Sequence, residues 1–181
     1  MRIISSSLLT LTFLALAACA PKGEAEKTGA WSLVSAESGI SYVTIKNGSL
    51  GEVNTFGMME GSVSEGGKAE FTVFLDSVDT NNEIRDPRMR EILFQTETYP
   101  AARAMANLDM AQFDSLPIGG TKTVLLDMTL DLHGVSEQFD VDVLVTRLGA
   151  NKVRVDNKAP LLIDAEDFGF EAGLAKLQEL A

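Results

Sequence analysis

Residues Val124 to Leu132 read VLLDMTLDL, and this stretch decides the fold class. Leucine or methionine stands at positions 126, 128, 130 and 132, and the residues between them are Asp127, Thr129 and Asp131. Successive side chains of a β-strand point to opposite faces of the sheet. This period of two therefore predicts a strand with one apolar and one polar face.

The next segment repeats the pattern. Phe139 begins a run in which valines at 141, 143 and 145 alternate with Asp140 and Asp142. Residues 133–136, HGVS, join the two segments, so we expect an antiparallel hairpin. Further strand-like segments lie near residues 31–34, 40–45, 53–56, 61–64, 71–75, 104–108, 152–155 and 161–163. Short strands at regular spacing predict an all-β fold, an antiparallel sandwich or barrel.

Two segments have a helical pattern. Asp86 followed by Pro87 is typical of an N-cap and a first helical position, and this helix should end before Tyr99-Pro100. A second helix is expected over residues 171–180, where leucines at 174, 177 and 180 form one stripe.

The composition excludes several classes of function. The chain has 181 residues, with 15 Lys and Arg against 26 Asp and Glu, and the resulting net charge of −11 opposes nucleic-acid binding. One Cys and one His cannot form an internal disulfide or an ordinary zinc site. No nucleophile motif or pair of active-site carboxylates is visible, so we expect a protein that is not an enzyme and needs no cofactor.

Other polar residues also have simple structural interpretations. The period-two spacing of Asp127, Asp131, Asp140 and Asp142 predicts the wet outer face of two strands, because calcium loops group their carboxylates in a tight turn. Met58 and Met59 alone offer too few ligands for a copper site. His133 has no partner for metal binding or catalysis, so we expect it to face solvent in the hairpin turn.

The N-terminus predicts export. Residues 1–18 combine Arg2, an apolar run and closing small residues, as a signal peptide does, and the only cysteine follows at Cys19. The sequence LAAC resembles the bacterial lipobox, which implies a lipidated Cys19, a tether over residues 19–30 and anchoring on the periplasmic side of the outer membrane. The alternative is cleavage after Ala20 and a soluble periplasmic or secreted protein. The remaining residues 31–181 would form one domain.

Two ordered blocks resemble the YceI-like family. The first is the sequence SVDTN at 77–81 with Arg85-Asp86, a short helix and Tyr99-Pro100. The second, LDMTLDLHGVS at 126–136, is similar to the family's L-T-L-x-G-V-T hairpin. Trp31, Ile40 and Tyr42 fit the opening strands, and residues 163–169 fit a late D-F-G-like segment. The resemblance implies a periplasmic or secreted, lipocalin-like antiparallel β-barrel that holds a polyisoprenoid or similar apolar chain.

The alternation of the strands then identifies candidate residues inside the barrel. The expected inward-facing residues are Tyr42, Phe71, Val73, Leu75, Leu126, Met128, Leu130, Phe139, Val141 and Val143. Alternation alone favours a dry core, whereas the family resemblance favours a lumen that accepts a polyisoprenoid or quinone-like lipid. A register error of one residue would turn these side chains outward.

Candidate head-group contacts lie between a strand and the first helix. They are Asn82, Arg85 and Arg88, since Arg suits the geometry of phosphate. The alternative is structural: Asp86 caps the helix and Arg85 pairs with a local acid.

One departure from the family concerns closure of the barrel. Family members usually continue after the D-F-G-like segment into a last strand, whereas here a helical stretch leads to Ala181. The barrel would then lack its closing strand, unless the helix covers the gap. An open edge could pair with a second copy to form a homodimer or with another partner. The second hypothesis for function is therefore an envelope interaction module with a filled barrel.

Overall fold

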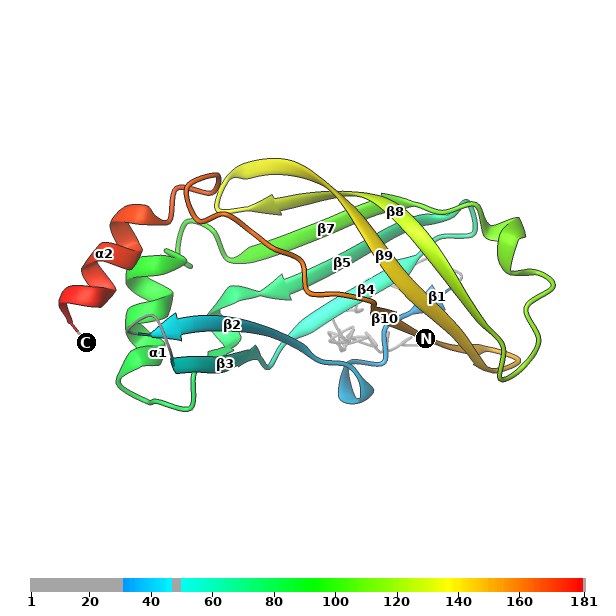
Figure 1. Ribbon diagram of the computed structural model, residues 1–181, viewed down its shortest axis with the longest axis horizontal. Helices are drawn as coiled ribbons and strands as arrows, with labels where there is room; N and C mark the ends of the chain where they lie inside the picture. Colours follow the sequence, from blue (N-terminus) through cyan, green and yellow to red (C-terminus); the bar gives the residue numbers. More distant parts are fainter. Residues whose placement is uncertain (1–30, 47–49, 181) are drawn as a thin grey trace, which may run out of the picture.

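The computed structural model describes residues 31–46 and 50–180, and antiparallel strands dominate it (Figure 1). The expected all-β class is confirmed, and most of the predicted strands are present. The strands are β1 (Trp31–Ser32), β2 (Ile40–Lys46), β3 (Leu50–Phe56), β4 (Met59–Val63), β5 (Lys68–Phe74), β6 (Val78–Asp79), β7 (Ala101–Asn107), β8 (Thr121–Leu132), β9 (Val135–Gly149) and β10 (Lys152–Asn157).

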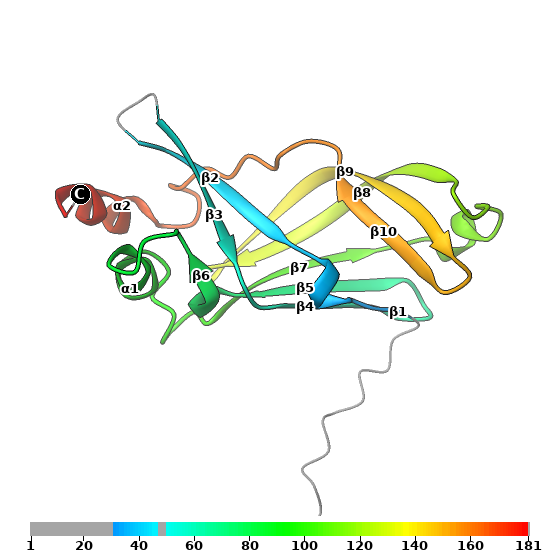
Figure 2. The ribbon, with the colours of Figure 1, turned by 90° about the horizontal axis from the view of Figure 1, so that it is seen from below.

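The strands form one curled layer. A seven-stranded sheet has the order β1-β4-β5-β7-β8-β9-β10, and a three-stranded sheet has the order β2-β3-β6. Only Gly57 and Met58 separate β3 from β4, and the 3-10 turn η2 (Leu75–Ser77) separates β5 from β6. The small sheet therefore extends the large one around a bend, and together they make a half-barrel (Figure 2).

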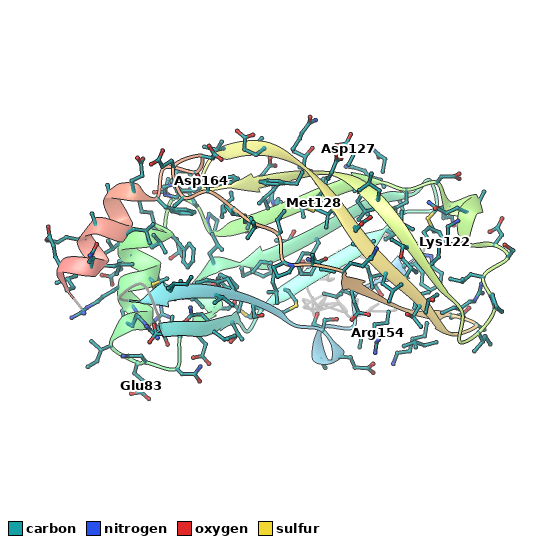
Figure 3. The ribbon with its side chains drawn as sticks, viewed as in Figure 1. Glu83, Lys122, Asp127, Met128, Arg154 and Asp164 are labelled. Atoms are coloured by element: carbon teal, nitrogen blue, oxygen red, sulfur yellow. The ribbon has the colours of Figure 1, made fainter. Side chains whose placement is uncertain are left out.

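The hairpin of β8 and β9 confirms the alternation seen in the sequence. Its register pairs Leu126 with Val141 and Met128 with Phe139 on the inner, concave face. Asp127 faces Asp140 on the outer face, and Figure 3 shows Asp127 projecting away from the concave side. Both aspartates are exposed, so the expected wet outer face is present at these positions.

The sheet does not close. β10 pairs only with β9, and the edge formed by β1 and β2 has no partner strand among the described residues. The strand expected at residues 161–163 was wrong, because this segment is irregular: Leu161 turns inward to pack while Leu162 is 86% exposed. The segment from Lys158 onward crosses the open side of the half-barrel between β2 and β9 (Figures 1 and 2).

The first helical region begins earlier than expected. It consists of α1 (Arg85–Arg88) and a π-helical turn, η3 (Met89–Leu93). The expected N-cap at Asp86 was wrong, because the Asn82 side-chain oxygen accepts from the backbone N–H of Ile84 and Arg85. The Asp86 carboxylate instead accepts from the backbone and hydroxyl of Thr80 at 2.9 and 2.6 Å.

The predicted C-terminal helix is present as α2 (Glu171–Glu179) and packs on η3. A Cβ at Gly173 would lie 2.9 Å from the carbonyl oxygen of Ile92, so glycine allows this close approach. Arg88 donates to the carbonyl of Leu180 at 2.9 Å and joins the two helical regions. The helix thus covers one end of the half-barrel and not its open side (Figure 1).

Two apolar clusters fill the two ends. The helix-end cluster contains Leu75, Val78, Met89, Leu93, Phe94, Leu130, Leu132, Phe168 and Phe170. The far-end cluster contains Val124, Val141, Val143 and Val145. Met128 and Phe139 are half-buried and contact both clusters, so they connect the two ends along the inner face.

The turn between β8 and β9 contacts the C-terminal segment through His133. His133, expected to face solvent, is half-buried between the rings of Tyr99 and Phe170, with centroid separations of 4.3 and 4.8 Å. Its Nδ1 lies 2.9 Å from the carbonyl oxygen of Phe168, so the ring donates this hydrogen bond. The expectation failed because the partners of His133 come from distant parts of the chain.

Phe168 is completely buried in the helix-end cluster. We expect Phe168→Ala to lower the free energy of unfolding by about 3–5 kcal/mol, because the substitution removes buried area and leaves a cavity. Urea unfolding followed by circular dichroism measures this change. The control is Leu162→Ala, since Leu162 is exposed, and an equal loss in both variants would contradict the assignment of the core.

Gly134 adopts a φ of +82°, and a Cβ there would lie 2.9 Å from Cε1 of Tyr99. We expect Gly134→Ala to destabilise the fold by about 1–3 kcal/mol, from backbone strain and from the contact with Tyr99. Gly39→Ala is the matched control, because a Cβ at Gly39 meets no atom within 4 Å. Thermal unfolding of the two variants should differ; equal midpoints would contradict the geometry of the turn.

Candidate functional site

Apolar residues of neighbouring strands lie side by side across the inner face. In register across three strands lie Gly61 of β4, Phe71 of β5 and Ala104 of β7, followed by Leu130 of β8. Gly61, Phe71 and Ala104 are only half-buried. A Cβ at Gly61 would already meet Cβ of Leu33 and the ring of Phe71 at 3.3 and 3.4 Å, so this part of the inner face is apolar, partly exposed and lined by these neighbours.

The ten predicted lining residues lie at different depths of this face. Leu75 and Leu130 belong to the helix-end cluster, and Val141 and Val143 to the far-end cluster. Tyr42, Leu126, Met128 and Phe139 are half-buried and pack against one or both clusters. Phe71 and Val73 lie on β5 and belong to neither cluster as the described residues define them. Val73 is buried and Phe71 half-buried, so the structure places most of the predicted lining in packed positions and leaves Phe71 partly exposed.

The three predicted head-group contacts have partners within the protein. Asn82 caps the start of α1, and Arg88 donates to the carbonyl of Leu180. Arg85 forms an ion pair with Glu52 and donates to the carbonyl of Thr80. Its acidic partner is distant in sequence, on β3, and not a local acid as the structural alternative assumed.

A polar group of side chains occupies the helix end of the inner face, and we call it the polar end. Tyr42 of β2 lies directly opposite Asn54 of β3. Asn54 is 2% exposed, and its amide nitrogen lies 3.3 Å from the hydroxyl oxygen of Thr44. Glu52 shares the face of Asn54 and pairs with Arg85 across to α1.

The Tyr42 ring links the polar end to the apolar cluster. The ring packs against Phe56 and Phe94, with centroid separations of 5.4 and 6.3 Å. Burial raises the pKa of Tyr42 well above its usual value; the Arg85 cation opposes this rise, and the Asp86 carboxylate adds to it. The hydroxyl therefore stays protonated at neutral pH and can donate a hydrogen bond.

Asn54 and Glu52 were not among the predicted site residues. The signal was in the segment 50–56, LGEVNTF, where Glu52, Asn54 and Phe56 alternate with Val53 and Thr55. Period two predicts a mixed face there, but the register against β2 is needed to place Asn54 opposite Tyr42.

A depression lies beside the turn between β8 and β9. It has a volume of about 200 Å³, is open to solvent, and is lined in part by Tyr99, Arg103, Asp131 and His133.

Within residues 31–46 and 50–180, no group of three or more His, Cys, Asp or Glu could hold a metal ion. No helix in the same ranges is long and apolar enough to span a bilayer.

Solved structures share this fold. A polyisoprenoid binding domain from Saccharophagus degradans, implicated in plant cell wall breakdown, is 37% identical, with a TM-score of 0.81 over 83% of this chain and 87% of that chain. Burkholderia cenocepacia BcnA is 21% identical, with a TM-score of 0.60 over 78% and 87% of the two chains. The Campylobacter jejuni YCEI protein is 19% identical, with a TM-score of 0.53 over 80% and 85%.

The sequence has no significant match among proteins with curated functions. The sequence profile of the YceI-like domain matches residues 31–180, which is nearly the whole described region. The match covers the curled sheet, the polar end and both helical regions. The chain therefore belongs to the YceI-like family.

Proposed function

We propose that this protein binds an apolar lipid, a polyisoprenoid or quinone-like chain, along the inner face of its half-barrel. The observation that carries the proposal is the row of partly exposed apolar residues on that concave face, Gly61, Phe71 and Ala104. The similarity to the polyisoprenoid binding domain from Saccharophagus degradans supports the ligand class. The protein acts by binding and not as an enzyme.

Burial of apolar surface is sufficient to hold such a ligand. Each buried methylene contributes about 0.8 kcal/mol, so a five-carbon isoprene unit contributes on the order of 3–4 kcal/mol when fully buried. A chain of several units can therefore offset the entropy lost on binding. The ligand slides in along the open side between β2 and the segment from Lys158 onward, where no strand has to be displaced.

We also propose that the protein is a lipoprotein on the periplasmic side of the outer membrane. The support is the lipobox-like sequence before Cys19, which lies outside the described residues. An anchor at Cys19 and a tether to residue 30 would hold the half-barrel close to its source of lipid.

A second candidate function rests on the free edges of the sheet. β2 and β10 each have one unpaired side in the described region, and exposed Val43, Ile45 and Val53 lie on the outer face of the β2–β3 hairpin. A protein that used these surfaces would be an interaction module, with a partner strand or a second copy added to the edge.

Lipid capture tests the first function. The full chain should be expressed in a Gram-negative host, purified gently and examined by native mass spectrometry, followed by extraction with organic solvent. We expect a bound apolar species of discrete mass. Ala104→Phe should reduce the bound fraction at least about threefold, because the larger ring would cover the partly exposed apolar row of the inner face.

Asn107→Phe is the matched control, because Asn107 is exposed on the same strand. Circular dichroism should show that both variants are folded. A bare monomer in the wild type would contradict lipid binding, and a bare dimer would select the interaction module instead.

Lipidation is tested at Cys19. We expect the wild-type protein to incorporate a fatty-acid probe and to fractionate with membranes, and Cys19→Ser to lose both properties, because the thiol is the only attachment point that the sequence offers. Metabolic labelling and cell fractionation measure this. A wild-type protein that is unlabelled and soluble would support simple export.

A further inference from the structure

The polar end contains three buried polar atoms that have no hydrogen-bond partner among the described residues. They are the hydroxyl oxygen of Tyr42, the side-chain oxygen of Asn54 and Nε of Arg85. Each buried polar atom without a partner costs about 1–3 kcal/mol, so three in one place is unusual. Rotating the Asn54 amide would exchange which of its atoms lacks a partner but would leave one unpaired.

These atoms belong to one site. Tyr42 and Asn54 are directly opposed across β2 and β3, and their side chains therefore point to the same face. Arg85 is held next to them by Glu52, which lies two residues from Asn54 on that face. Because Tyr42 also packs in the helix-end cluster, the site borders the apolar inner face.

The hydrogen-bonding capacity of the site is mixed. Arg85 Nε–H is a donor, the Asn54 oxygen is an acceptor, and the protonated Tyr42 hydroxyl can do either. A hydroxyl group satisfies this combination, since it donates one hydrogen bond and accepts others. A hydrocarbon satisfies none of it.

The charges of the site oppose an anion. Among the described side chains of the polar end the cation is Arg85, which is already paired with Glu52, and the carboxylate of Asp86 lies near enough to influence Tyr42. The three charged groups sum to one negative charge, so a phosphate would meet net repulsion and an Arg85 that is already engaged.

We propose that the polar end binds the head group of the lipid, and that this head group is uncharged and bears a hydroxyl. The inference rests on the proposed lipid binding and specifies its ligand: a long-chain alcohol or phenol, with its tail along the inner face. Asn54, nine-tenths and more buried, fixes the position of the hydroxyl together with Tyr42.

The test compares three probes with similar branched tails: geranylgeraniol, geranylgeranyl phosphate and the hydrocarbon phytane. Each is titrated into delipidated full-length protein, and binding is measured by native mass spectrometry. Tyr42→Phe removes only the hydroxyl and keeps the ring that contacts Phe56 and Phe94. Tyr99→Phe is the matched control, because Tyr99 is the only other tyrosine and lies beside His133.

We expect Tyr42→Phe to weaken binding of the alcohol about twofold to tenfold, the effect of one hydrogen bond, and to leave phytane binding unchanged. Tyr99→Phe should change neither affinity. The phosphate should bind the wild type at least about tenfold more weakly than the alcohol.

The other outcomes separate the two proposals. If all three probes bind and Tyr42→Phe has no effect, the polar end holds only water and the head-group inference is overturned while lipid binding stands. If Tyr42→Phe weakens all three probes equally, Tyr42 has a structural role and the inference is again overturned. If no probe binds, the proposed lipid binding itself fails.

Discussion

A curled sheet with two free edges has to protect its concave apolar face by some means other than a closing strand. In this protein, the two ends are protected by separate clusters of side chains, and of the described residues outside the clusters only Met128 and Phe139 contact both. The helices cover one end, and an irregular segment runs across the open side (Figure 2). Gly61, Phe71 and Ala104, which belong to neither cluster, stay partly exposed on this face, and the proposed lipid binding rests on them.

Apolar and polar parts of the interior are arranged in sequence along the same face. The ring of Tyr42 belongs to the apolar wall, whereas its hydroxyl belongs to the polar end. An elongated amphiphile has the same order of parts, a tail and then a head. In the proposed binding mode, Tyr42 and Asn54 determine the direction in which such a molecule lies, and the half-barrel determines the length of tail that it buries.

The pattern of alternating residues predicted most of the strands, because strand periodicity is a local property. The hairpin around residues 133–136 and the helix at 171–179 were predicted for the same reason. The prediction of a strand at 161–163 was wrong because a short apolar run does not reveal whether a neighbouring strand is available to pair with it. The predicted N-cap at Asp86 was wrong because another side chain, that of Asn82 four residues earlier, accepts a hydrogen bond from the first backbone N–H of the helix.

The candidate site was less predictable than the fold. The ten lining residues were chosen by alternation, and the structure divides them between packing and accessible positions. Asn54 was missed because its environment depends on the pairing of β2 with β3. The placement of His133 likewise depends on Phe168, which is distant in sequence. Contacts of this kind require the register and the turn geometry of the whole chain.

The attachment of α2 to η3 has a consequence for the order of folding. The hydrogen bond from Arg88 reaches the carbonyl of Leu180, across 92 residues, whereas the β8–β9 hairpin joins neighbours in sequence. Long-range contacts form late because a large loop must close first. Until the segment with Phe168 and Phe170 has joined the helix-end cluster, Phe94 lacks the ring of Phe170 and keeps its ring contacts with Tyr42 and Phe56, so partly folded chains expose more apolar surface at this stage.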